Sequence, residues 1–219
     1  MTERFIHQLR VELPPVTETV IEARERLREK FPRPALRRMT HLGLLVGSTL
    51  EETQLGEDDA LVYATTFAET RALEDFLKSF PTASPLLFQT SIHPGGVQQV
   101  MIGRQQPVAR IWPLAGRARL VEHALLTALL EPAGRVAVVG GEERGTWLLD
   151  ANMASARAFA FAFVLTPEAA GSVGRIRCEQ ASATTRDQPC PTLPEFAAAL
   201  AGRRPLAWTG GSMSWSLQW

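Results

Sequence analysis

The segment "RIWPLAGRARLVEHALLTALL", residues 110–130, combines a short apolar strand, a corner of small residues and an amphipathic helix. In several classes of α/β enzyme, a strand-to-helix elbow of this kind holds a nucleophile beside backbone N–H groups. The corner here is Leu114-Ala115-Gly116-Arg117, and none of these side chains can attack a carbonyl carbon. The sequence therefore predicts a degenerate elbow, with Ala115 and Gly116 where a catalytic group would stand.

His93 is the clearest candidate for acid–base chemistry, because it precedes a proline and two glycines in the loop "SIHPGG". The simpler interpretation is a histidine at a helix entry, bonded to nearby backbone. Serines in "QTSIH" and "GGSMSW" could act as nucleophiles, although neither has a visible base and orienting residue. A small acyltransferase or hydrolase that uses His93 and a serine stays open as an alternative.

Other polar residues point to no further chemistry. The glycines of "VVGGEERG" have the wrong spacing for a dinucleotide site. Glu142 and Glu143 end a strand, where carboxylates can be catalytic, although as an exposed strand end they need no function. His7 and His41 have no companions at metal-ligand spacing, and His123 is expected to face solvent. We therefore expect no metal and no cofactor.

The composition fits a globular chain. Apolar residues make up 45% and charged residues 21%, which argues against disorder, and 23 basic residues balance 23 acidic ones, so nucleic acid and membrane surfaces are not expected partners. Cys178 and Cys190 form no CxxC and do not indicate a secreted scaffold; their redox state stays open. The first residues lack a signal-peptide core and no apolar run has membrane-spanning length, so we expect a cytoplasmic protein without membrane insertion.

The order of the predicted elements gives the fold class α/β, a mixed sheet flanked by helices. Residues 1–35 are predicted to be a peripheral segment with a charged helix between prolines, and residues 36–219 a single domain. Helices are predicted at 36–50, 68–80, from Pro94 or Gly95, at 117–130 and after an N-cap at Thr192. Strands are predicted at 59–67, 107–113, "GRVAVVGGEE", "ARAFAFAFVLTP", "GRIRCEQAS" and the tail "PLAWTGGSMSWSLQW".

The ordered features "SPLLFQTSIHPGGVQQVMIG", "PVARIWPLAGRARLVEHALLTALL" and "GRVAVVGGEE" resemble the N-terminal half of β-ketoacyl synthases. The stretches "ALRRMTHLGLLVGS" and "LVYATTFAET" resemble the helix and strand that come before them in that family. The likeness covers about residues 36–143. It implies a layered thiolase-like fold, reduced relative to a full ketosynthase because the second half is confined to residues 157–219.

Within this family, the chain is most similar to the small chain-length-factor subunits of aryl polyene and related type II polyketide or fatty acid clusters. The resemblance aligns Gly116 with the acyl-accepting cysteine of active ketosynthases, and the decarboxylation histidines belong to the reduced half. It therefore implies a pseudoenzyme that condenses no acyl chains by itself.

The resemblance also implies a heterodimer with a catalytic ketosynthase subunit, which an acyl carrier protein reaches through the complex. The strand "PVARIW" would pair with the partner. The implied interface residues are Val108, Arg110, Ile111, Trp112, Leu114 and His93. The implied residues lining the partner's acyl tunnel are Phe88, Trp112, Gly116 and Leu120. A scaffold or homodimeric binding module is the third possibility.

Overall fold

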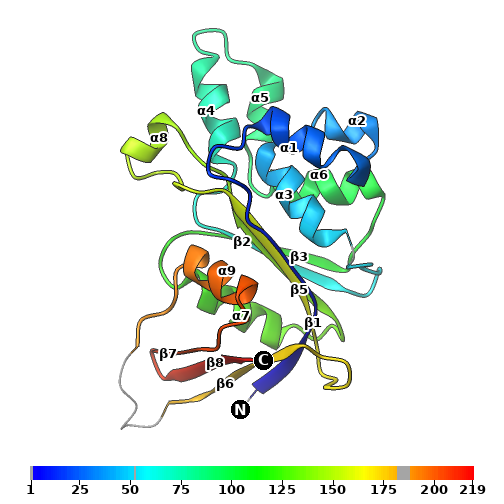
Figure 1. The fold of residues 1–219 in the computed structure, drawn as a ribbon, viewed down its shortest axis with the longest axis vertical. Helices are drawn as coiled ribbons and strands as arrows, with labels where there is room; N and C mark the ends of the chain where they lie inside the picture. The colour runs from blue at the N-terminus through cyan, green and yellow to red at the C-terminus, as the bar shows by residue number, and fades with distance from the viewer. Residues whose placement is uncertain (1, 52, 182–187) are drawn as a thin grey trace.

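The computed structural model describes residues 2–51, 53–181 and 188–219, and their strands form one eight-stranded mixed sheet (Figure 1). The strand order is β3-β2-β4-β5-β1-β6-β8-β7. β2 is parallel to both β3 and β4, and every other neighbouring pair is antiparallel. The strands are β1 (Thr2–Glu12), β2 (Ala60–Thr65), β3 (Arg110–Ala115), β4 (Val136–Glu142), β5 (Phe159–Thr166), β6 (Gly174–Gln180), β7 (Leu206–Gly210) and β8 (Met213–Gln218).

Helices cover both faces of this sheet. One face carries α7 (Leu120–Leu130) and α9 (Leu193–Ala201), and the other carries α3 (His41–Leu50) and α6 (Gly95–Arg104). The remaining helices are α1 (Val20–Arg26), η1 (Arg28–Lys30), α2 (Arg33–Leu36), α4 (Thr70–Lys78), α5 (Pro85–Thr90) and α8 (Trp147–Asp150). In the part of the chain that the structure describes, no helix combines the length and the apolar character needed to cross a membrane.

The centre of the sheet confirms the predicted buried strands. β2 and β4 are buried along their whole length, and β5 along all but its last residue. Alternate side chains enter two separate cores: Val62 packs with α7 and α9, whereas Leu61 and Tyr63 pack with α3 and α6. A Cβ at Gly140 would lie 2.3 Å from the Phe161 ring, so β4 needs glycine at that point.

The first residues correct the sequence analysis, which placed residues 1–35 at the periphery. β1 lies inside the sheet between β5 and β6, and its Ile6 is fully buried. The rest of β1 is half-buried or exposed and includes Arg4 and Arg10, so its apolar alternation is weak. The predicted charged helix is confirmed as α1, which begins after a capping box of Thr19 and Glu22 and packs on α3.

The C-terminal elements agree with their sequence patterns. Thr192 caps α9 and forms a capping box with Glu195. The tail folds into the hairpin β7–β8, which closes the far edge of the sheet as the alternation of the sequence predicted. Trp208 and Trp215 stack across this hairpin with ring centres 5.8 Å apart. The opposite edge of the sheet is therefore β3, the strand that leads into the elbow.

Candidate functional site

The predicted elbow forms the corner between β3 and α7, at residues 116–119 rather than 114–117. Gly116 has φ +143°, a conformation that favours glycine, and its N–H donates to the Thr65 carbonyl at 3.2 Å. Arg119 adopts the left-handed conformation at φ +53° just before α7. The side chains from Ala115 to Arg119 are methyl, hydrogen or guanidinium groups, so the corner carries no nucleophile.

The elbow lies at the carboxyl ends of the parallel strands, where open α/β sheets bind ligands. Because β2, β3 and β4 are parallel, their carboxyl ends, Thr65, Ala115 and Glu142, lie at the same edge. Ligands of open α/β sheets bind at such an edge. The Arg117 guanidinium lies 4.8 Å from the centre of the Phe67 ring, in the loop that follows β2. The elbow therefore presents backbone and basic groups.

Glu142 and Glu143 correct the expectation of an exposed strand end, since their side chains are 1% and 0% exposed. Burial raises the pKa of each carboxyl to about 7. Glu142 Oε1 accepts the Thr66 N–H, whereas its Oε2 has no hydrogen-bond partner among the described residues.

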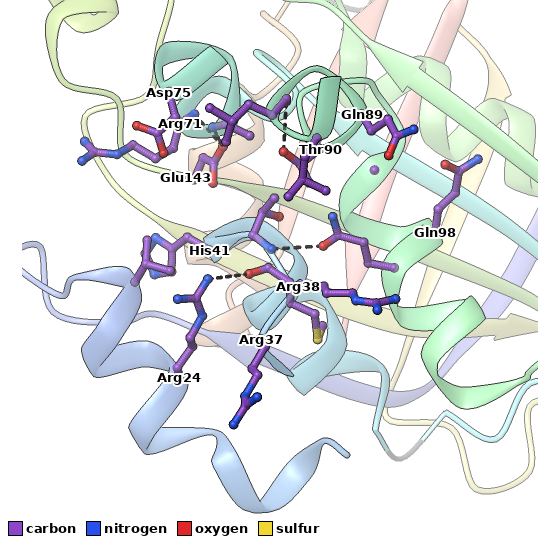
Figure 2. Close-up of a pocket in the computed structure, with 18 of the residues that line it drawn as sticks. Arg24, Arg37, Arg38, His41, Arg71, Asp75, Gln89, Thr90, Gln98 and Glu143 are labelled. Carbon is purple, nitrogen blue, oxygen red and sulfur yellow. Dashed lines mark hydrogen bonds between the residues drawn. The ribbon is translucent and has the colours of Figure 1, made fainter. Parts of the chain in front are cut away.

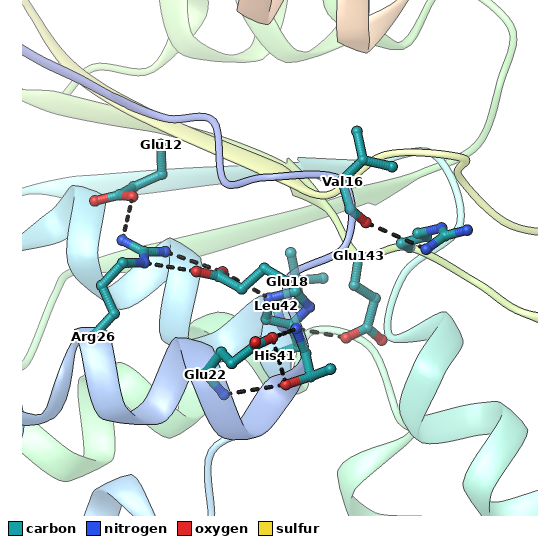
Figure 3. Close-up of polar contacts among 10 residues, drawn as sticks. Glu12, Val16, Glu18, Glu22, Arg26, His41, Leu42 and Glu143 are labelled. Carbon is teal, nitrogen blue, oxygen red and sulfur yellow. Dashed lines mark hydrogen bonds and ion pairs between the residues drawn. The ribbon is translucent and has the colours of Figure 1, made fainter.

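Glu143 joins the first turns of two helices. Its Oε1 accepts the Arg71 N–H of α4 at 2.6 Å. Its Oε2 accepts the Leu42 N–H of α3 at 3.2 Å (Figure 3). Free N–H groups at helix N-termini favour a negative partner. Glu143 thus adds to the Thr40 cap of α3 and supplies the side-chain acceptor that the N-cap residue of α4 does not provide, which fastens both helices to the end of β4.

A second polar network lies beside it, where α1 meets α3 (Figure 3). Arg26 joins Glu12 and Glu18, with nitrogen–oxygen distances of 3.0 and 2.7 Å. The buried His41 places Nε2 3.5 Å from a Glu18 oxygen. Burial lowers the pKa of His41, although Glu18 opposes this effect. These contacts fix α1 over the start of α3, so His41 belongs to the packing between the two helices.

The surroundings of His93 differ from the simpler interpretation, in which its ring is bonded to nearby backbone. Its ring stacks on Tyr63 with centres 5.1 Å apart, and Nδ1 lies 3.6 Å from Glu69 Oε2. Neither ring nitrogen has a hydrogen-bond partner among the described residues, so the bond to nearby backbone is not formed and His93 has no bonded serine there. Tyr63 packs in the core of α3 and α6, one strand in from β3. His93 therefore lies against Tyr63 of β2, beside the buried carboxyl group of Glu69.

One glutamate accepts hydrogen bonds from two side chains of the edge strand β3. Glu131, at the end of α7, has a side chain only 2% exposed. It accepts hydrogen bonds from Arg110 Nε at 2.9 Å and from Trp112 Nε1 at 2.7 Å. The Trp112 side chain is nevertheless 43% exposed. Glu131 therefore holds two outward side chains of the edge strand in fixed positions, a contact that sequence patterns gave no reason to expect.

The other residues predicted for the interface flank β3 on both faces. Val108 and Ile111 pack partly buried against the core of α3 and α6, and Leu114 packs against the core of α7 and α9. Arg110, Trp112 and Ala115 are exposed. The structure thus brings the predicted strand together at one sheet edge, with His93 set back from it.

The residues predicted to line a tunnel occupy three places. Leu120 is buried in the core at the first turn of α7, whereas Trp112 is held at the last turn of that helix. A helix of this length spans about 16 Å. Phe88 is half exposed on α5 and packs on Phe76 of α4, with ring centres 5.4 Å apart. Gly116 has open space around the position of an added Cβ.

The remaining candidates have ordinary surroundings. His123 faces solvent on α7, as predicted. His7 Nε2 lies 3.0 Å from the Glu168 carbonyl oxygen. Cys178 and Cys190 are free thiols, and burial raises the pKa of Cys178 to about 11. A thiol with so high a pKa is a poor nucleophile.

Comparisons with known proteins find similar solved structures but no similar curated sequences. No family model matches the sequence. No curated protein is similar to it in sequence. The structure is similar to a chain in the complex of the ketosynthase ApeO with its chain length factor ApeC from Xenorhabdus doucetiae, with TM-score 0.66, 18% identity and 100% coverage of both chains.

Two further structures extend this likeness. The ishigamide ketosynthase/chain length factor matches with TM-score 0.55 and 13% identity, over 82% of this chain and 68% of that one. A β-ketoacyl synthase from Burkholderia phymatum matches with TM-score 0.52 and 13% identity, over 70% of this chain and 50% of that one. The match that covers both chains completely shows that an entire known chain is built on this plan. This protein has the thiolase-like fold of the ketosynthases, in a form reduced relative to the full-length enzymes.

Proposed function

We propose that this chain is a non-catalytic, chain-length-factor-like subunit that pairs with a catalytic β-ketoacyl synthase in polyketide or polyene biosynthesis. The observation that carries the proposal is the elbow. It keeps a strand, a corner and a helix, yet residues 115–119 offer only methyl, hydrogen and guanidinium side chains. The fold match to a ketosynthase/chain length factor complex supports the same function.

The edge strand β3 supplies the pairing surface. One edge of β3 pairs with β2, and its other edge pairs with no strand among the described residues. An exposed strand edge is a ready template for a strand of another chain. Arg110, Trp112 and Ala115 stand exposed along it, and Glu131 holds the first two in place. A partner strand would therefore meet a preformed surface, which reduces the entropy lost on binding.

Length control would follow from the same pairing. In this proposal, the partner's acyl tunnel ends against the elbow, and an acyl carrier protein delivers substrate to the catalytic subunit. Gly116 suits the end of a tunnel, because the space around its Cα is open. Phe88 offers a half-exposed ring, whereas Leu120 would act from the core behind the elbow. Trp112, held by Glu131, belongs to the pairing surface.

The pairing can be tested with one substitution on each edge of the sheet. Ala115 on β3 and Ala207 on β7 are both exposed alanines of edge strands. We expect Ala115→Glu to weaken the complex with a co-expressed ketosynthase by about tenfold or more, equivalent to ~1.4 kcal/mol, while Ala207→Glu leaves it unchanged. Native mass spectrometry and a binding titration provide the measurement. Equal affinity of both variants, or a homodimer that excludes the ketosynthase, would reject this function.

A further inference from the structure

A groove of about 880 Å³ opens on the α3 and α6 side of the sheet, apart from the proposed pairing surface (Figure 2). Its walls come from α1, from the turn before α3, and from α4, α5 and α6. None of its lining residues belongs to β3 or α7. Its volume lies in the range of about 300–1,000 Å³ that is typical of small-molecule sites.

Four arginines line this groove: Arg24, Arg37, Arg38 and Arg71. Arg24 donates from Nη2 to the Met39 carbonyl at 3.2 Å, and its buried Nε has no acceptor among the described residues. Arg37 and Arg38 are exposed and form no ion pair with any described residue. Such uncompensated guanidinium groups favour an anion, which they bind in bidentate geometry.

The acidic residues of the lining do not neutralise these arginines. Glu143 is buried, and its two oxygens accept backbone N–H groups of α3 and α4. Asp75 is exposed on α4. Arg71 lies 3.6 Å from Glu74 Oε2, which leaves Arg24, Arg37 and Arg38 as the cationic group at one side of the groove (Figure 2). The whole chain has a net charge of zero, so this concentration of positive charge is local.

The same groove has an apolar wall. Leu86 of α5 and Ile102 of α6 are 66% and 77% exposed, an unusual degree for such side chains within one cavity lining. The apolar lining consists of Val20, Met39, Leu86, Leu87 and Ile102, with Ala72 near the floor. Arginines beside aliphatic side chains match a ligand with two chemically different ends.

We propose that this groove binds an amphiphilic anion, a molecule with an apolar tail and a carboxylate or phosphate head. The arginines of α1 and of the turn before α3 hold the head, and the leucines of α5 with Ile102 cover the tail. The site is independent of the proposed function, because it needs neither the β3 edge nor a ketosynthase. A carboxylate and a phosphate share the recognising chemistry, and separate probes distinguish them.

Calorimetric titration of the full chain tests the site with three probes below their micellar concentrations: dodecanoate, dodecyl phosphate and dodecanol. We expect at least one of the two anions to bind, with dodecanol at least about tenfold weaker because its neutral hydroxyl cannot form a bidentate ion pair with a guanidinium group. The double substitution Arg37→Ala/Arg38→Ala should weaken anion binding by about tenfold or more. The matched control is Arg203→Ala/Arg204→Ala. It removes the side chains of another exposed pair of adjacent arginines, which lies outside the groove.

The alternative outcomes are distinct. Equal affinity for dodecanol and the anions, or equal effects of the two arginine pairs, would overturn the proposal. Tighter binding of an acidic amphipathic helical peptide than of either anion would assign the groove to a protein partner and also overturn it. The exposed side chains of Arg37 and Arg38 have no hydrogen bond or ion pair with the described residues, and alanine keeps their backbone bonds, so unchanged thermal unfolding is the internal check. Leu86→Ser removes an apolar contact instead of a charge and should weaken both anions to a similar extent.

Discussion

Trp112 Nε1 donates a hydrogen bond to Glu131 Oε2 at 2.7 Å, which joins the exposed edge strand β3 to the last turn of α7. The same carboxylate accepts from Arg110, and the Glu131 carbonyl accepts from Arg4 of β1. The lowered pKa of Glu131 follows from the hydrogen bond of Arg110. One buried glutamate therefore connects the edge strand, a helix end and an interior strand.

Glu131→Ala should loosen this edge. We expect the free energy of unfolding to fall by about 1–3 kcal/mol, because the donors of Trp112 and Ala133 lose their acceptor. Affinity for the ketosynthase should fall as well, since Arg110 and Trp112 are no longer held in place. Urea denaturation measures the first effect and a binding titration the second. A more conservative change, Glu131→Gln, keeps one acceptor oxygen and should recover part of both losses; equal loss in the two variants would contradict this view.

Glu142 and Glu143 make the stability of the fold depend on pH. Burial raises the pKa of each carboxyl from 4.5 to about 7, so the folded chain binds protons more tightly than the unfolded chain between these values. Stability should therefore decrease as the pH rises from about 4.5 through 7, by up to on the order of 3 kcal/mol for each group. Urea denaturation at several pH values measures this slope.

The two glutamates should respond differently to the neutral isostere. Glu142→Gln removes an expensive buried charge and keeps an acceptor for Thr66, so it should flatten the slope and stabilise the chain above pH 7. Glu143→Gln instead turns an amide NH₂ toward backbone donors of α3 or α4, and should destabilise by about 1–3 kcal/mol. Identical pH profiles for the two variants would refute the assignment of separate roles.

Local sequence signals predicted much of this structure. The N-cap at Thr192 predicted α9, and continuous apolar runs predicted β2, β4 and β5, because caps and burial patterns act within a few residues. The sheet position of β1 could not be read in this way. Its charged residues hide the alternation, and the residues of β5 and β6 that pair with it lie 148 or more positions along the chain, the smallest separation being that of Glu12 and Ala160.

The candidate site was predicted less completely than the fold. The strand, corner and helix of the elbow follow from residues adjacent in sequence, and the structure confirms this arrangement between β3 and α7. The interpretation of the corner as a degenerate nucleophile site stays a prediction. The burial of Glu143 depends on Leu42, which lies 101 residues away, and the position of Trp112 depends on Glu131. Such long-range polar contacts leave no periodic signal, which is why Glu143 was expected at an exposed strand end.

The elbow should form no acyl adduct. After incubation with acyl or malonyl carrier protein, we expect intact-mass spectrometry to show an unmodified chain, because Ala115 and Gly116 offer no nucleophile. Gly116→Cys should produce no synthase, since no described base lies at this corner. The control is the ketosynthase partner, which should acquire the adduct under the same conditions. An acyl group mapped to residues 115–119 of the unaltered chain would contradict the proposed function.

Product length is the most direct test of a tunnel that ends at the elbow. Phe88→Leu is the best probe, because the ring is half exposed and its loss leaves the core intact. We expect longer carrier-bound products from the intact complex, measured by mass spectrometry at matched complex concentrations. Leu120→Ala enlarges the space at the start of α7 instead, but it removes a core side chain, so it should cost about 2–5 kcal/mol and needs a stability control.

Gly116 supplies the opposite test. At φ +143° a substituted residue is strained by about 1–3 kcal/mol even though the space beside it is open, so Gly116→Ala isolates the strain from the filling of that space. Gly116→Leu fills the open space beside Gly116 with a branched apolar side chain, which leaves less room for an acyl chain. It should therefore shorten the product relative to Gly116→Ala in complexes of equal stability. Trp112→Phe, which loses the hydrogen bond to Glu131 and part of the exposed ring surface, should change affinity for the ketosynthase while product length stays the same. Unchanged lengths for Phe88→Leu and Gly116→Leu together would remove the elbow from the wall of the tunnel.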